Sequence, residues 1–101
     1  MQNTSRSEYL DEYSPKWRRR FERLDNSVKI RAVKKIGQIL KGLHSEHACL
    51  GLPYFKENID ENYRICYKSF EDRKVRRFYF VGDHKEYDRW LAGGGDSEEA
   101  E

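Results

Sequence analysis

Two stretches rich in aromatic and branched side chains lie close together in the C-terminal half, and they limit the possible folds more than any other feature. Residues 63–70 (YRICYKSF) and 75–81 (VRRFYFV) are separated by only four charged residues. Such runs are typical of β-strands, and so short a charged link predicts an antiparallel hairpin. Residues 53–59 come before this hairpin and are joined to it by an Asp-Glu-Asn turn, which predicts a third neighbouring strand.

The N-terminal half has a helical periodicity. Residues 8–13 form a short apolar segment that we interpret as a first strand. Residues 14–24 begin with Ser-Pro, a typical helix start, and carry an apolar residue at every third or fourth position. Residues 27–40 repeat this pattern and end before Gly42, a natural C-terminal cap, and residues 86–91 favour a short terminal helix. The order predicts an α+β fold (β-α-α-β-β-β) whose helical hairpin packs on one face of a small twisted antiparallel sheet.

The length of 101 residues allows a single domain, which we expect to span residues 1–92, with residues 93–101 as a disordered glycine-rich and acidic tail. Although the net charge is only +2, residues 14–41 contain ten Lys or Arg and two acidic residues. This asymmetry predicts an anionic partner, either nucleic acid or an acidic protein segment, although a merely solvated helix face would give the same pattern.

The two cysteines, Cys49 and Cys66, have no metal-ligand spacing. No signal peptide, membrane-spanning run, CxxC or HExxH motif, or glycine-rich phosphate loop is present. We therefore expect a cytoplasmic protein with no cofactor, no metal and no membrane contact.

The chemistry-bearing residues of the predicted hairpin suit a phosphodiester. Arg64 lies early on one strand, His84 follows the end of the next, and Tyr87 comes three residues later. An antiparallel hairpin would bring the two ends together. Guanidinium groups form fixed, charged forks to phosphate oxygens, free imidazole exchanges protons near neutral pH, and aromatic rings stack on unpaired bases. These residue types predict metal-free RNA binding or cleavage, whereas an ordinary surface ion pair and loop histidine are the alternative.

The chain also resembles the RelE/ParE superfamily of toxins from type II toxin–antitoxin modules. The resemblance rests on EYSPKWRRRFERLDNSVKIRAVKKIGQIL, on YFKENIDENYRICY, and on VRRFYFVGDHKEYDRWL. It implies a ribosome-dependent, metal-independent endoribonuclease (mRNA interferase) that blocks translation by inducing attack of the mRNA 2′-hydroxyl on its own phosphate. The implied partners are the ribosome, mRNA and a cognate antitoxin, with a homodimer or a toxin–antitoxin heterotetramer as the assembly.

The resemblance implies individual roles. Arg64 matches the arginine that contacts the scissile phosphate, and His84 an arginine or histidine of the nucleases. Tyr87 matches an aromatic that stacks on or deprotonates the substrate, with Trp90 as the competing candidate for that role. Relatives carry two strand lysines at positions that match Phe55 and Glu57. Glu57 is thus the candidate base. Lys56 lies between the two positions and is expected to point to the opposite face of the sheet. The expected RNA-binding residues are Lys56, Lys68, Arg77, Lys85, Arg89, Arg19 and Lys34.

An alternative remains open because the expected strand lysines are missing. The chain could instead be a ParE-like DNA gyrase inhibitor or a catalytically inactive, antitoxin-binding member of the family. ParE-like chains generally lack the basic and histidine set, so the presence of His84 and Tyr87 favours the nuclease.

Overall fold

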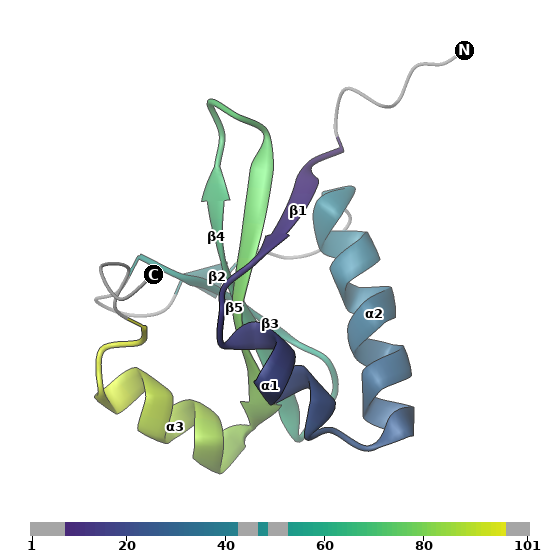
Figure 1. Ribbon diagram of the computed structural model, residues 1–101, viewed down its shortest axis with the longest axis vertical. Coiled ribbons are helices and arrows are strands. Elements are labelled where there is room, and N and C mark those ends of the chain that lie inside the picture. Colours follow the sequence, from purple (N-terminus) through teal and green to yellow (C-terminus); the bar gives the residue numbers. More distant parts are fainter. Residues whose placement is uncertain (1–7, 43–46, 49–52, 97–101) are drawn as a thin grey trace.

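The computed structural model describes residues 8–42, 47–48 and 53–96, which form a strand, two helices, four strands and a last helix (Figure 1). The bounds are β1 Leu10–Tyr13, α1 Trp17–Glu22, α2 Asn26–Leu40, β2 His47–Ala48, β3 Phe55–Asn58, β4 Tyr63–Phe70, β5 Val75–Asp83 and α3 His84–Ala92. No helix in these ranges is long and apolar enough to cross a membrane.

The strands form one sheet in the order β1-β5-β4-β3-β2. The predicted hairpin is confirmed, because β4 and β5 pair antiparallel along their whole length, and β3 pairs antiparallel with β4. We had expected an antiparallel sheet. The sheet is instead mixed, because β1 pairs with β5 in parallel. The chain leaves β1 through the two helices before it returns, and this long connection allows the parallel pairing.

The first helices cover one face of the sheet, as predicted. The side chain of Asp25 caps α2 by accepting a hydrogen bond of 3.0 Å from the Val28 N–H, and Gly42 leaves the helix with a φ of 76°. Helix α1 starts later than predicted: its N-cap is Lys16, while Ser14 is buried and its N–H donates to the Phe78 carbonyl of β5. The core under both helices comprises Trp17, Ala32, Ile36, Ile39, Ile65, Tyr67, Phe78 and Val81.

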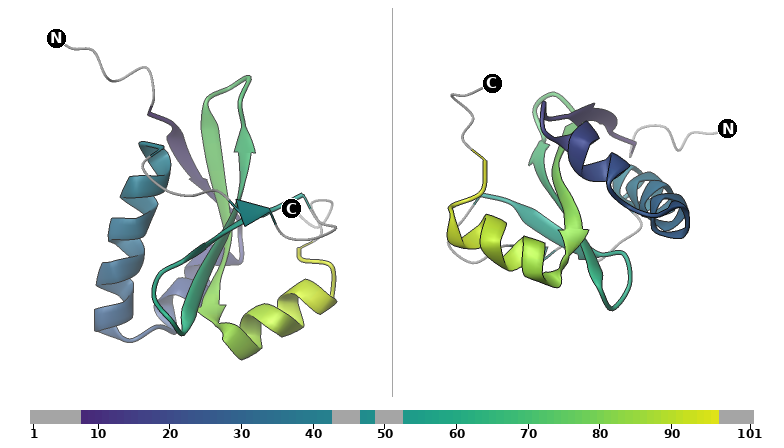
Figure 2. Two further views of the ribbon diagram at one scale, coloured as in Figure 1. Left: turned by 180° about the vertical axis from the view of Figure 1, so that it is seen from behind. Right: turned by 60° about the horizontal axis from the view of Figure 1, so that its bottom comes forward.

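Helix α3 covers the opposite face, so that the sheet lies between two helical layers, as the right panel of Figure 2 shows. A second core fills this side and comprises Tyr54, Cys66, Tyr79, Phe80, Tyr87 and Trp90. Consecutive residues Tyr79 and Phe80 both join it because a bulge interrupts the ladder. Phe78 opposes Tyr67 and Phe80 opposes Cys66, so β5 has one more residue than β4 at this point.

The turn between β3 and β4 is fixed by Asp60. Its carboxylate accepts hydrogen bonds from the backbone N–H groups of Asn62 and Tyr63 and from Arg31 of α2. Burial raises the pKa of the Asp60 carboxyl, but these hydrogen bonds outweigh it and hold the pKa below its ordinary value. The turn thereby fixes the register that places Asn58 opposite Arg64.

Candidate functional site

Arg64 lies on the sheet face that α3 covers. Its guanidinium carbon is 4.6 Å from the centre of the Tyr87 ring. Its Nε donates a hydrogen bond of 3.0 Å to Oδ1 of Asn58, its partner on β3. The arginine is therefore held from two sides, by an aromatic face and by a side-chain amide.

Lys56 joins the same cluster from β3. Its ammonium nitrogen is 5.9 Å from the centre of the Tyr87 ring. As expected for a position between Phe55 and Glu57, Lys56 points to the face opposite theirs, and this is the face that carries Arg64. Lys56 opposes Cys66, which packs under α3, so two cations converge on one buried tyrosine.

Tyr87 is brought over the sheet by a tight start of α3. Asp83 caps the helix: its carboxylate accepts from the Glu86 N–H at 2.9 Å, and the Glu86 carboxylate accepts from the Asp83 N–H at 3.0 Å. Gly82 permits this closeness, because a Cβ atom there would lie 2.6 Å from Oε1 of Glu86 and 2.8 Å from Cζ of Phe80.

His84 is the first residue of α3 and is exposed. It precedes Tyr87 by three residues, so the two side chains are neighbours along the helix. The exposed imidazole therefore lies at the start of the helix that carries Tyr87, one turn before it. Lys85 is exposed beside it.

Glu57, the candidate base, lies on the other face of the sheet. Its side chain is buried, and Oε1 is 3.9 Å from Nζ of Lys35 on α2. Phe55 packs against the same helical core. Because alternate residues of a strand point to opposite faces, Glu57 cannot share a site with Lys56 and Arg64, and the structure does not bring it there.

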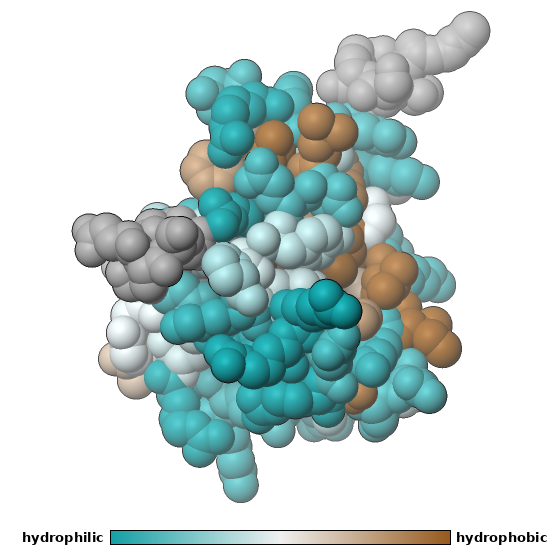
Figure 3. Space-filling model, in the orientation of Figure 1, coloured by the Kyte–Doolittle hydropathy of each residue, from teal (hydrophilic) through white to brown (hydrophobic). Residues whose placement is uncertain are grey.

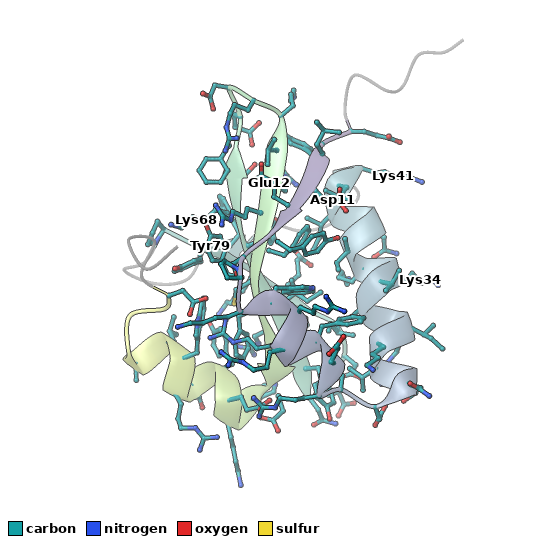
Figure 4. The ribbon with its side chains drawn as sticks, in the orientation of Figure 1. Asp11, Glu12, Lys34, Lys41, Lys68 and Tyr79 are labelled. Carbon is teal, nitrogen blue, oxygen red and sulfur yellow. The ribbon has the colours of Figure 1, made fainter. Side chains whose placement is uncertain are left out.

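The other basic residues fall into separate groups. Lys68 and Arg77 lie farther along the sheet, with the Lys68 ammonium 5.0 Å from the ring centre of Tyr54 and 5.2 Å from that of Tyr79, and the Arg77 guanidinium 5.5 Å from Tyr79. Figure 4 shows Lys68 beside Tyr79, with Lys34 on the distant α2. Arg19 is exposed on α1. The helix cations are therefore remote from the cluster.

Arg89 faces a different feature, a cleft of about 600 Å³ between α1 and α3. Arg23 crosses this cleft and contacts Glu86 at 2.6 Å. Arg20, Phe80 and Trp90 also line it.

Asn58 was not foreseen as a site residue. The signal for it was available, because the three-residue turn at residues 60–62 places Asn58 across from Arg64 once the hairpin register is fixed. No three His, Cys, Asp or Glu side chains in the described parts of the chain are grouped so as to hold a metal ion. What the cluster can do chemically is bind and polarise an anion.

No family model matches the chain. No curated protein sequence matches it either. Solved structures are similar in fold. An E. coli RelE toxin mutant in the free state gives a TM-score of 0.70 at 18% identity, covering 83% of this chain and 92% of RelE. The isolated E. coli RelE toxin gives 0.66 at 19% identity, covering 84% and 97%.

A chain of the E. coli DinJ–YafQ toxin–antitoxin complex gives a TM-score of 0.65 at 16% identity, covering 78% of this chain and 96% of its own. The matches extend over most of each chain, and the shared arrangement of helices and strands is that of the E. coli RelE and YafQ toxins. The predicted fold is thereby confirmed.

Proposed function

We propose that this protein is the toxin of a type II toxin–antitoxin module and that it cleaves mRNA on the ribosome without a metal ion. The observation that carries the proposal is the convergence of Arg64 and Lys56 on the ring of Tyr87, at 4.6 and 5.9 Å. Two cations on one sheet face, with an exposed histidine at the start of the helix that carries Tyr87, are suited to a phosphodiester whose negative charge increases during reaction. The RelE-type fold supports the same function.

The reaction is an attack of the ribose 2′-oxygen on the adjacent phosphorus. The bond from phosphorus to the 5′-oxygen breaks, which leaves a 2′,3′-cyclic phosphate on one fragment and a 5′-hydroxyl on the other. Arg64 forks to the non-bridging oxygens and Lys56 adds a second positive charge as the phosphorane forms. Protonated His84 donates a proton to the departing 5′-oxygen, and the 2′-hydroxyl proton passes to solvent water.

Tyr87 has a supporting role in this proposal. Its side chain is buried, with 3% of the residue exposed, and it contacts Phe80 beneath it. A ring in this position holds the plane of the Arg64 guanidinium by a cation–π contact. Tyr87 therefore orients Arg64 for its contact with the phosphate. The exposed helix residues Arg19 and Lys34 contact ribosomal RNA instead, with a salt-dependent affinity.

The experiment is to express the protein under tight control and to map mRNA 5′ ends on translating ribosomes. The wild type should cut within translated codons, and Arg64→Ala should abolish the cuts. Arg18→Ala is the matched control, because Arg18 is an exposed arginine whose ion pair is with Glu22 on the same helix. Growth arrest and DNA damage with intact mRNA would favour a gyrase inhibitor, and no arrest at all would indicate an inactive protein.

An antitoxin is the proposed protein partner. E. coli RelE has been crystallised with RelB, and YafQ with DinJ. This chain exposes large apolar side chains on β1 and α2, namely Leu10, Tyr13, Ile30 and Val33. Figure 3 shows brown areas on this side of a largely teal surface. Exposed apolar groups flanked by lysines suit an amphipathic acidic segment. Co-purification with the product of an adjacent small reading frame tests this partner.

A further inference from the structure

Asp96, in the segment that follows α3, has a buried carboxylate that is hydrogen-bonded to two side chains. Asp96 accepts hydrogen bonds from both terminal nitrogens of Arg20, Nη1 at 2.9 Å and Nη2 at 3.0 Å, in a bidentate pair. Its Oδ1 also accepts from the indole N–H of Trp90 at 3.1 Å. The Asp96 side chain is 6% exposed and that of Arg20 17%. Few ion pairs in the described residues are so well enclosed, and this one joins the C-terminal segment to α1.

Three glycines bring Asp96 back to this position. Gly93 ends the helix, and Gly94 and Gly95 have φ values of 85° and 79°, which glycine adopts without strain. The N–H of Gly95 donates to the Trp90 carbonyl at 2.9 Å. A Cβ atom on Gly95 would lie 2.6 Å from the ring of Tyr54. The glycine run, expected as the start of a disordered tail, is in residues 93–96 a compact turn.

Tyr54 secures the end of the turn through the backbone. Its hydroxyl donates to the Asp96 carbonyl at 3.0 Å and accepts from the Asp96 N–H at 3.2 Å. We call residues 93–96, with their contacts to Arg20 and Tyr54, the C-terminal latch. The latch joins α3 to α1 and to the chain just before β3.

The latch acts on the helix that carries Tyr87. The Trp90 ring stacks on that of Phe80, with 5.0 Å between ring centres, and its centre is 4.8 Å from that of the Tyr54 ring. Trp90 lies one turn beyond Tyr87 on the same face of α3. The capping box at Asp83 fixes one end of this nine-residue helix, and the latch fixes the other. A helix so short has little stability of its own, so its position depends on such tertiary contacts.

From this we infer that Arg20 and Asp96 are positioning residues, which hold α3 against the sheet so that Tyr87 stays over Arg64 in the site of the proposed nuclease. The inference rests on the proposed function for its catalytic consequence, whereas its structural part stands without it. Burial raises the pKa of the Asp96 carboxyl, but the hydrogen bonds from Arg20 and Trp90 and the charge of Arg20 outweigh burial and keep the pKa below its ordinary value. The carboxylate is therefore ionised at neutral pH and the pair is complete.

A buried ion pair is a poor source of net stability, because desolvation offsets much of its attraction. Removing one partner is costly, since the other charge is left buried. The pair therefore suits a role in fixing one position of α3 more than a role in raising overall stability.

The test compares Asp96→Ala and the milder Asp96→Asn in the full-length chain. The matched control is Glu22→Ala, which removes the carboxylate of the exposed Arg18–Glu22 pair. Hydrogen exchange of the α3 amides reports the position of the helix. Fluorescence in a Trp17→Phe background isolates Trp90. Single-turnover and steady-state cleavage on ribosomes separate kcat from KM.

We expect α3 amides of Asp96→Ala to exchange roughly a hundredfold faster while β4 and β5 stay protected. Trp90 emission should shift to the red. We also expect kcat to fall on the order of 10- to 100-fold with KM nearly unchanged, because Arg64 and Lys56 belong to the sheet and still bind phosphate. Asp96→Asn should give the same changes to a smaller degree, and Glu22→Ala should give none.

Unchanged exchange and fluorescence in both Asp96 variants would overturn the latch. A loss of kcat with α3 still protected, or a mobile α3 with full kcat, would overturn the positioning role. If the wild type cuts no mRNA, the proposed function fails, and exchange and fluorescence alone then decide whether the latch exists.

Discussion

Gly82 is the point where a single added methyl group should disturb the site most sharply. A Cβ atom there would lie 2.8 Å from Cζ of Phe80 and 2.6 Å from Oε1 of Glu86. The Phe80 ring cannot retreat, because it is buried and stacked on Trp90 at 5.0 Å. The Glu86 carboxylate can move, but it would then leave both the Asp83 N–H and Arg23.

The expected cost of Gly82→Ala has two parts. Overpacking a rigid core costs about 1–3 kcal/mol, and losing half of a capping box costs about 1 kcal/mol. The free energy of unfolding should therefore fall by about 2–4 kcal/mol, which lowers the urea midpoint by on the order of 1–2 M.

Gly37→Ala is the control, for which the free energy of unfolding should change in the opposite direction. Gly37 is inside α2, and a Cβ atom there meets nothing within 4 Å. Alanine in an open helical position should stabilise the protein by roughly 0.5–1 kcal/mol. Urea unfolding followed by circular dichroism measures both variants. Equal stability of Gly82→Ala and wild type would refute the close packing of α3 on β5.

Three further predictions concern the cluster and the carboxylates. Arg64→Lys keeps the charge but loses the planar fork, so single-turnover cleavage should slow by about 10- to 100-fold; an unchanged rate would exclude the clamp. Asp25→Ala removes the cap of α2 and should lower the urea midpoint, because the Val28 N–H loses its acceptor. The pKa values of Asp25, Asp60 and Asp96 are lowered in the folded state. Their contribution to the stability of the fold is present above the ordinary carboxyl pKa of about 4 and is lost below it. Thermal unfolding should therefore show stability falling with acidification under about pH 4. A stability that does not change with pH in that range would contradict these pKa shifts.

The β4–β5 hairpin could be predicted from the sequence because its signals are local. Branched and aromatic runs and a charged turn fix both strands, and β4 begins and ends where predicted. The parallel pairing of β1 could not be read in this way, since it joins residues more than 60 positions apart. The late start of α1 has a similar cause: Ser14 is held by Phe78 of β5, which removes it from the helix.

Part of the candidate cluster could be predicted, because Arg64 and Tyr87 are in contact and His84 begins the helix that carries Tyr87. Glu57 was assigned to the wrong face because matching a strand to its relatives depends on a register, and a shift of one residue moves every side chain to the other face. The contacts of Asp96 were also beyond sequence reasoning. A glycine run with an acidic residue looks like a disordered tail until Arg20 and Trp90 are placed around it.

The most direct measurement uses ribosomes programmed with an mRNA that carries a single 2′-deoxy nucleotide at the cleaved position. The proposed chemistry requires the 2′-hydroxyl as nucleophile, so the all-ribose mRNA should be cut to a 2′,3′-cyclic phosphate and a 5′-hydroxyl, and the 2′-deoxy mRNA should stay intact at that position. Cleavage of both mRNAs at equal rates, or fragments that end in a 5′-phosphate, would contradict this mechanism. No cleavage of either would contradict the nuclease function itself.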